Sequence, residues 1–265
     1  MTNILDKIIA QKLMELENFD SFETLQDRLD DLIQAETLPA TKGFAQTIRE
    51  TEGAAIIAEL KKASPSKGVF REDFDVLDVA RKYRQGGAHC FSVLTDNRFF
   101  QGSYENLILV SSEFDIPCLC KEFIIDERQI AQARISGADA VLLIAAILDN
   151  KQLEEFKFLI EDYGMDALIE VHNDVEMEKV LSHDFDFIGI NNRDLTTFEV
   201  SLDTTSKMIS KYKYDLGGRT IISESGITSK KDILILEQIG VKGFLVGESL
   251  IVQDDLEEAV KKLIF

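Results

Sequence analysis

Residues 137–194 read GADAVLLIAAILDNKQLEEFKFLIEDYGMDALIEVHNDVEMEKVLSHDFDFIGINNRD. Three short apolar runs, AVLLIAAIL, ALIEVH and FIGINNRD, begin at Ala140, Ala167 and Phe187, and amphipathic stretches with a helical period separate them. Apolar runs that alternate with helical stretches predict β-strands that pair in parallel, because each connection contains a helix that packs on the sheet.

The same alternation extends in both directions from about residue 54 to the end of the chain. Five further apolar runs show the same alternation with helical stretches: AAIIAELK from Ala54, CFSVLTD from Cys90, PCLCKEF from Pro117, TIISESG from Thr220 and GFLVGES from Gly243. Glycines precede several runs, as expected where a helix ends and the chain turns into a strand; they are Gly86, Gly87, Gly137, Gly164 and Gly240. Eight strand–helix units are the number that closes a barrel, so we expect an α/β fold of the (β/α)8 TIM-barrel class.

The first 50 residues show a purely helical pattern. Apolar residues recur at helical spacing from Ile4 to Leu16, and a second amphipathic stretch runs from Phe22 to Ile33. Asp20 and Glu23 have the spacing of a capping box at the start of this second helix. We therefore expect a single barrel domain over residues 1–265, of which 1–50 is an N-terminal helical arm.

The charge of the chain excludes some classes of partner. The formal net charge is −19, and the longest basic clusters, Lys61-Lys62, Lys230-Lys231 and Lys261-Lys262, hold two residues each. Nucleic acid would be repelled by such a chain. A few cations focused in a cleft can still bind an anionic small molecule.

The sequence also predicts where the protein works. The N-terminal segment MTNILDKIIAQKLMELE mixes charges among its apolar residues, so we expect no signal peptide, and no apolar run reaches the roughly 20 residues that span a bilayer. Three cysteines, Cys90, Cys118 and Cys120, cannot all pair within one chain. We expect a cytoplasmic protein without membrane partners.

The polar residues of the eight runs lie at their carboxyl-terminal ends, which in a TIM barrel form the rim that carries the active site. Glu59 and Lys61 are two residues apart, so they share a face at this rim. An ion pair that merely caps the barrel is the alternative, although burying such a pair is costly. The polar turn that starts at Ser64 is suited to binding an anion.

Lys121 and Glu170 end two further runs. Burial would lower the pKa of Lys121 and make it a usable general acid. The alternative is that Lys121 only pairs with Glu122 or Asp126. Glu170 is the best-placed general base, although a carboxylate that pairs with a lysine would show the same pattern.

The last three runs suggest a site for a phosphorylated substrate. Asn191 and Arg193 share a face, and an amide with a guanidinium suits a substrate that bears hydroxyl and acidic groups. Small residues follow the seventh and eighth runs, where barrels of this class bind phosphate through backbone amides; the residues there are Glu224, Ser225, Gly226, Gly247 and Glu248.

Metal and nucleotide sites lack support. Cys118 and Cys120 point to the same face, but a zinc site needs about four ligands, and the three histidines lack motif spacing. We find no nucleophile elbow, no GxGxxG after a strand and no Walker motif. We expect neither a metal nor a cofactor.

Eight strings resemble, in order, the signature motifs of the indole-3-glycerol phosphate synthase family: IIAELKKASPSKG, SVLTDNRFFQGS, CKEFIIDERQI, GADAVLLIAAIL, LIEVHN, IGINNRDL, ISESGI and LVGESL. The resemblance covers about residues 54–251, and the helical arm is also similar to that family's. Ala63 stands where some relatives carry a lysine, and Glu248 stands where some carry a serine.

The resemblance implies a role for each matching residue. The implied catalytic group is Glu59, Lys61, Lys121, Glu170 and Asn191. The implied substrate-binding residues are Ser64, Phe100, Arg193, Leu195, Glu224 and Ser225, of which Phe100 and Leu195 would pack on the anthranilate ring. The implied phosphate contacts come from Ser64, Gly226, Gly247 and Glu248, together with Lys61.

The resemblance also implies the reaction. The substrate would be 1-(2-carboxyphenylamino)-1-deoxyribulose 5-phosphate, converted without a cofactor by ring closure, decarboxylation and dehydration. We expect Lys121 to be the first general acid, while the assignment among Glu59, Glu170 and Lys61 stays open. We expect a monomer. The alternatives are another phosphate-binding barrel, such as phosphoribosylanthranilate isomerase or tryptophan synthase α subunit, and a barrel that only binds ligand.

Overall fold

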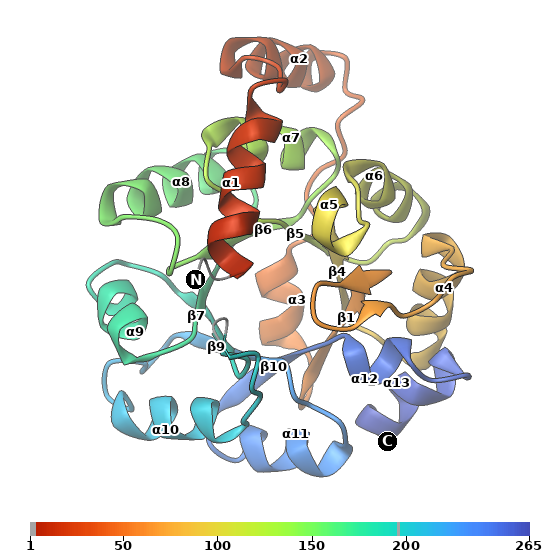
Figure 1. Cartoon of the computed structure of the whole chain (residues 1–265), viewed down its shortest axis with the longest axis vertical. Helices are drawn as coiled ribbons and strands as arrows, with labels where there is room; N and C mark the ends of the chain where they lie inside the picture. Colours follow the sequence, from red (N-terminus) through yellow and green to blue (C-terminus); the bar gives the residue numbers. More distant parts are fainter. Residues whose placement is uncertain (1–3, 195–196) are drawn as a thin grey trace.

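The computed structural model describes residues 4–194 and 197–265, and within these ranges eight parallel strands close into a barrel (Figure 1). In chain order they are β1 (Ala55–Leu60), β4 (Cys90–Leu94), β5 (Cys118–Lys121), β6 (Ala140–Ile144), β7 (Asp166–Val171), β8 (Phe187–Asn191), β9 (Thr220–Glu224) and β10 (Val241–Val246). Each strand pairs with its neighbours in sequence order, and β10 pairs with β1 to close the ring. The predicted TIM-barrel fold is confirmed.

Helices surround the barrel between successive strands (Figure 1). They are α4 (Val76–Gly86), α5 (Asn97–Phe100), α6 (Tyr104–Glu113), α7 (Glu127–Ile135), α8 (Asn150–Asp162), α9 (Asp174–Leu181), α10 (Asp203–Lys211), α11 (Lys230–Glu237), α12 (Glu248–Ile251) and α13 (Leu256–Ile264). Polar residues cap the first turns of several, as in the capping boxes of Asp126, Asp149 and Ser229. Gly87 and Gly137 turn out of their helices with φ values of 99° and 83°, which favour glycine.

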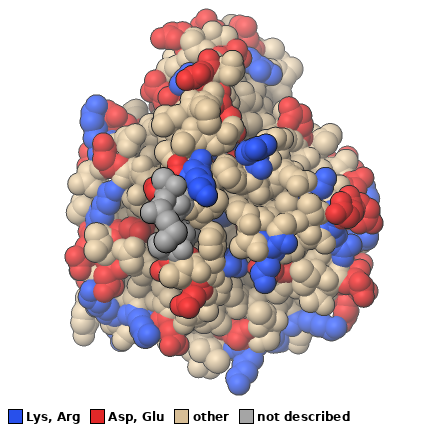
Figure 2. Space-filling model, in the orientation of Figure 1, with Lys and Arg blue, Asp and Glu red and all other residues tan. Residues whose placement is uncertain are grey.

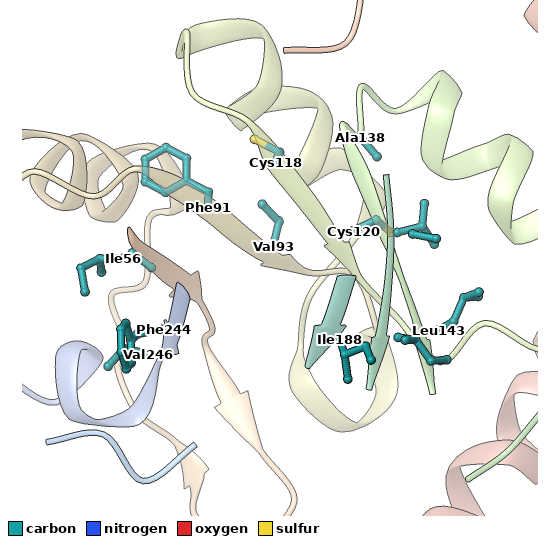
Figure 3. Close-up of a cluster of buried hydrophobic side chains, with 14 of the residues drawn as sticks. Ile56, Phe91, Val93, Cys118, Cys120, Ala138, Leu143, Ile188, Phe244 and Val246 are labelled. Atoms are coloured by element: carbon teal, nitrogen blue, oxygen red, sulfur yellow. The ribbon is translucent and has the colours of Figure 1, made fainter. Parts of the chain in front are cut away.

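Alternation along the strands separates two apolar cores. Ile57, Leu119 and Leu168 point into the barrel, whereas Ile56, Cys118 and Cys120 point outward against the helices. Figure 3 shows part of this outer core, where Cys118 and Cys120 lie on the same strand face, as predicted. Lys121 lies two residues after Leu119 and therefore on the same face of the strand, so it points into the barrel mouth.

The N-terminal arm touches both ends of the barrel. In the described part of the arm, α1 (Ile4–Leu16) crosses the face at which the strands end, and α2 (Phe22–Gln34) packs on α7 (Figure 1). The third helix, α3 (Phe44–Glu50), closes the opposite end, where Ala45 N donates a hydrogen bond of 2.8 Å to Asp166 Oδ2. The arm is therefore part of the barrel's packing at both ends.

The local structure corrects two sequence-based expectations. The N-cap of α2 is Ser21, whose hydroxyl accepts from Thr24 N at 3.2 Å, so the capping box of Asp20 and Glu23 was wrong by one residue. The turn after β1 contains a small hairpin of β2 (Ala63–Ser64) and β3 (Gly68–Val69), which was not predicted. Among the described residues, no helix combines the length and the apolar character needed to cross a membrane.

Candidate active site

A cavity of about 650 Å³ opens at the carboxyl-terminal ends of the strands, beneath α1. Every predicted site residue that the structure describes lines it: Glu59, Lys61, Ser64, Phe100, Lys121, Glu170, Asn191, Arg193, Glu224, Ser225, Gly226, Gly247 and Glu248. Leu195 lies outside the described residues. Figure 2 shows several Lys and Arg side chains towards the middle of this face, while most Asp and Glu side chains lie nearer its edge.

Lys121 lies between two buried carboxyl groups from different strands. Its Nζ is 2.6 Å from Glu170 Oε2 of β7 and 2.9 Å from Glu224 Oε2 of β9. Glu122 faces Lys12 instead, and Asp126 pairs with Arg128 at 2.7 Å. The alternative in which Lys121 only pairs with Glu122 or Asp126 is therefore wrong.

The carboxylates reverse the expected change in the Lys121 pKa. Burial alone would lower it, but Glu170, Glu224 and Glu59 together raise the pKa of Lys121 above its ordinary value. The prediction of a lowered pKa was wrong because it took account of burial and not of the charges that converge on the ammonium group. Lys121 is thus a charged hydrogen-bond donor at neutral pH.

The two carboxyl partners of Lys121 differ from each other. Burial, reinforced by Glu170 and opposed by Lys121, raises the pKa of Glu224 to about 8. Burial acts on Glu170 in the same direction, but Lys121 and His172 hold its pKa well below the usual range. Two neighbouring carboxyls with opposite shifts are the arrangement from which acid and base roles arise in enzymes.

Glu59 and Lys61 form a second charged pair at the end of β1. Lys61 Nζ donates to Glu59 Oε1, and the same ammonium lies 5.6 Å from the centroid of the Phe70 ring. Gly247, directly after the neighbouring strand β10, makes room for this pair, because a Cβ at position 247 would overlap the Glu59 carboxylate. The pair was predicted at this rim, and it shares one cavity with Lys121 rather than sealing the barrel.

Arg193 and Asn191 lie together after β8. Asn191 Oδ1 accepts from Arg193 N at 3.0 Å, and the Arg193 guanidinium donates to Glu248 Oε2 at 3.2 Å. The other oxygen of Glu248 is 3.6 Å from Lys67 Nζ. Since the Glu248 carboxylate faces two cations, only its backbone amide is suited to contact a phosphate.

The loops after β9 and β10 have the features of an anion-binding rim. Ser225 and Gly226 adopt left-handed conformations with φ of 65° and 82°. Ser249 Oγ donates to Ile227 O at 2.7 Å and so joins the two loops. Ser64, in the β2–β3 hairpin, lines the same cavity.

An apolar wall lies on the other side of the cavity. The Phe100 and Phe123 rings are 6.0 Å apart between centroids, with 35° between their planes. Leu142 of β6 and the α1 residues Ile4, Leu5 and Ile8 complete the wall. Such a surface suits an aromatic ring beside the charged groups.

Lys12 fastens α1 over the cavity. This buried lysine of α1 lies 2.9 Å from Asp96 Oδ2, 3.1 Å from Glu122 Oε1 and 2.8 Å from Glu15 Oε2. Burial would lower its pKa, but Glu122 and Asp96 raise it above the ordinary value. Because Glu122 follows Lys121 directly, this cluster connects the arm to the strand end that carries the central lysine.

Sequence reasoning missed three contributors to the site: Lys12, Phe123 and His172. His172 lies behind Glu170, with Nε2 3.0 Å from Glu170 Oε1 and Nδ1 2.9 Å from Glu176 Oε2. The spacing of Glu170 and His172 in LIEVH, two residues apart at the end of β7, was the signal that could have found it. The described residues contain no group of His, Cys, Asp and Glu that could hold a metal ion.

Known proteins resemble this chain over almost its whole length. The family model described as indole-3-glycerol phosphate synthase matches residues 5–263. Indole-3-glycerol phosphate synthase of Prochlorococcus marinus (strain MIT 9515) is 47% identical, with 98% of this chain and 89% of the relative covered. The enzyme of that name from Rippkaea orientalis is also 47% identical, with the same coverage.

Solved structures support the fold. Thiamine phosphate pyrophosphorylase from Pyrococcus furiosus has a TM-score of 0.56 at 18% identity and covers 80% of this chain and 93% of its own. KGPDC from Streptococcus mutans has a TM-score of 0.59 at 13% identity, with 80% and 96% covered. At these identities the likeness extends to the barrel and not to the chemistry.

Proposed function

The chain belongs to the indole-3-glycerol phosphate synthase family, and we propose that its rim residues perform that family's reaction with Lys121 as the first general acid. The protein is a decarboxylating lyase of tryptophan biosynthesis that acts on a phosphorylated small molecule. The observation that carries the assignment of roles is the contact of Lys121 with Glu170 and Glu224 inside the cavity.

In the first step, the aromatic carbon that bears the carboxylate attacks the ketone carbon of 1-(2-carboxyphenylamino)-1-deoxyribulose 5-phosphate. The carbonyl oxygen takes the proton of Lys121 as the new carbon–carbon bond forms. An ammonium group that is charged before the step suits this role, because it stabilises the negative charge that develops on the oxygen until the proton is transferred.

Two steps complete the reaction. The ring intermediate is cationic, so it accepts the electron pair of the breaking bond to the carboxylate, and carbon dioxide leaves without a cofactor. Dehydration then removes the hydroxyl group as water. Glu59, Glu170 and Lys61 carry the proton transfers of these steps, and Asn191 orients the substrate beside them.

The rest of the cavity fits the two ends of the substrate. Phe100 and Leu195 pack on the anthranilate ring, and Arg193, Glu224 and Ser225 surround its polar groups. The phosphate binds the hydroxyl of Ser64 and the backbone amides of Gly226, Gly247 and Glu248, with Lys61 nearby. The apolar wall and the loop geometry described above support this orientation.

We also propose that residues 1–265 form one domain that works in the cytoplasm as a monomer. Cys90, Cys118 and Cys120 are all unpaired and buried, which suits a reducing compartment. Sedimentation of the purified protein at micromolar concentration should give a single species of 29.9 kDa; a dimer would contradict the monomer.

The function is tested by adding the carboxyphenylamino-deoxyribulose phosphate to purified protein, without metal or nucleotide, and following indole fluorescence. Lys121→Met should lower turnover by roughly 10²–10⁴-fold, because the acid is lost, while binding of a phosphorylated product analogue persists. Lys151→Met, at an exposed surface lysine, is the matched control. Turnover of Lys121→Met close to that of the control would refute the role of Lys121.

A further inference from the structure

Glu170 contacts one cation through each of its two oxygens. Oε2 is 2.6 Å from Lys121 Nζ, and Oε1 is 3.0 Å from His172 Nε2. On the far side of the imidazole, Nδ1 of His172 is 2.9 Å from Glu176 Oε2, and the backbone N of His172 donates to the same oxygen at 2.8 Å. The Glu170 carboxylate thus lies between the Lys121 ammonium and the His172 ring, with His172 Nε2 at ion-pair distance and without hydrogen-bond geometry.

Of the two oxygens of Glu224, one has a polar partner among the described residues and the other has none. Its Oε2 shares Lys121, but its Oε1 is buried without a hydrogen-bond partner among the described residues. This oxygen lies against the backbone of β8, where a Cβ on Gly189 would overlap it. An ionised oxygen in such a place would have lost its hydration with nothing in return, which is costly.

The balance of charge points the same way. Lys121 and His172 are two cations, and Glu170 and Glu176 are the two carboxylates that face them. Glu59 is already paired with Lys61. A third ionised carboxylate at Glu224 would leave one buried negative charge without a counter-charge.

We propose that His172 is a positioning residue that distributes a proton between the two carboxyls: it holds Glu170 ionised and leaves Glu224 protonated at neutral pH. The proposal rests on the assignment of this rim as the catalytic site. His172 does not line the cavity, so it acts through Glu170 and not on the substrate.

His172 must be charged for this role. The ionisable groups that face it are Glu170 on its own strand and Glu176 on α9, with Lys121 of β5 beyond Glu170. Burial would lower the pKa of His172, but Glu170 and Glu176 raise it to about 10. The imidazole is therefore an imidazolium throughout the neutral range.

The protonation of Glu224 matters for the substrate, which carries a carboxylate and a phosphate. An ionised Glu224 would repel both groups, whereas a protonated carboxyl is neutral and does not. Glu170 keeps its capacity to accept a proton in the later steps. One histidine outside the cavity thus gives two similar side chains different tasks.

Carbon-13 NMR of the full-length protein labelled at the glutamate carboxyl carbons tests this directly. Glu170→Gln and Glu224→Gln assign the two signals. At pH 7 the Glu224 carbon should have the shift of a carboxylic acid and the Glu170 carbon that of a carboxylate. In His172→Gln, which keeps a donor and removes the charge, both signals should move towards each other, because the proton is then shared.

His183→Gln is the matched control, since His183 pairs with Glu154 on the outside of the barrel. If His172→Gln does not fold, Glu176→Gln removes one of the two carboxylates that keep His172 charged and should cause a smaller movement in the same direction. A Glu224 signal in the carboxylate position at pH 7, or signals that stay in place in a folded variant, would overturn the proposal. The NMR signals need no turnover, so a failed assay of the wild type would reject the proposed function alone.

Discussion

Glu224 is a buried carboxyl group whose ionisation costs the folded protein free energy. Its pKa rises from the ordinary value of 4.5 to about 8, with burial as the first cause. Between these two values the folded state binds more protons than the unfolded state, so this group lowers stability as the pH rises through the window. The cost is tolerated where the carboxyl lines the cavity, which is the usual place for such a compromise.

Glu224→Gln should therefore raise the unfolding temperature at pH 8 and lower kcat/KM. The gain in unfolding temperature should shrink as the pH falls towards 4.5 and below, because the wild-type carboxyl is then increasingly protonated in the unfolded state as well as in the folded state. Thermal unfolding by circular dichroism at pH 5, 6.5 and 8, beside the fluorescence assay, measures both effects. A variant less stable than the wild type at pH 8 would mean that the contact with Lys121 outweighs the desolvation of the carboxylate.

His172 changes stability with pH in the same direction as Glu224, but over a higher pH range. Its pKa rises from 6.5 to about 10, so its contribution is fully present below pH 6.5 and is lost as the pH rises towards 10. The wild type should exceed His172→Gln in unfolding temperature by the largest margin at pH 6, and the margin should narrow by pH 10. A margin that is constant between these pH values would show that packing, and not charge, makes the difference.

That these side chains line one cavity at the rim could be predicted from the sequence, and their ionisation states could not. The rim position of Lys121, Glu170 and Glu224 follows from strand ends that any parallel barrel brings together. The pKa of Lys121 depends on which carboxylates converge on it across the barrel, and no sequence spacing encodes that. His172 was set aside because it lacks metal-binding spacing, although its partner is a carboxylate on its own strand.

Helix α1 is held to the barrel by a buried charge cluster as well as by apolar contacts. Lys12 faces Asp96 and Glu122, which are both fully buried, so removing the lysine leaves two carboxylates without their cation. Lys12→Met should lower the free energy of unfolding by about 3–5 kcal/mol, measured by urea denaturation. Lys7→Met, at an exposed position of the same helix, should have little effect.

Lys12→Met should also weaken substrate binding, because α1 forms part of the apolar wall of the cavity. Ile4, Leu5 and Ile8 reach the cavity only while α1 lies over it. We expect KM to rise in Lys12→Met when it is assayed under conditions where it remains folded. An unchanged KM together with lower stability would show that α1 contributes to folding and not to substrate binding.

The junction of β10 and α12 makes room for a charged pair on another strand. Gly247 has φ of −124° and ψ of −73°, so its backbone is not in the left-handed region. The nearby Glu59 side chain requires glycine at position 247, because a Cβ there would overlap the Glu59 carboxylate. Gly247→Ala should therefore lower kcat and displace Glu59 with little change in unfolding temperature, and Gly217→Ala, with more space around it, is the control.

Helices and strands with a regular apolar pattern could be predicted from the sequence, whereas very short strands and the exact helix start could not. The starts of the eight strands were predicted within two residues, because apolar runs and helix-ending glycines mark them, whereas the predicted runs end one to four residues beyond the strands. The β2–β3 hairpin has two residues per strand, which is too short for a periodic signal. The start of α2 was misplaced because Asp20 and Ser21 are both good N-cap residues, and only the backbone decides between them.

The whole molecule is strongly acidic, yet it binds an acidic substrate. The net charge is −19, and Figure 2 shows that Lys and Arg side chains occur towards the middle of the face that holds the cavity. The acidic groups of the surface affect stability, whereas the cations near the cavity affect substrate binding. Repulsion among the surface carboxylates lowers the stability of the folded state, while the cations of the rim attract the phosphate.

Added sodium chloride should separate the two effects. Screening weakens the repulsion between exposed carboxylates, so the unfolding temperature should rise between about 0.01 and 0.5 M salt. The same screening weakens attraction at the mouth, so KM should rise while kcat changes little. Chloride is used because sulfate and phosphate would compete for the phosphate site. If KM falls with salt instead, the acidic surface governs the approach of the substrate, and the cations at the rim act only after it has bound.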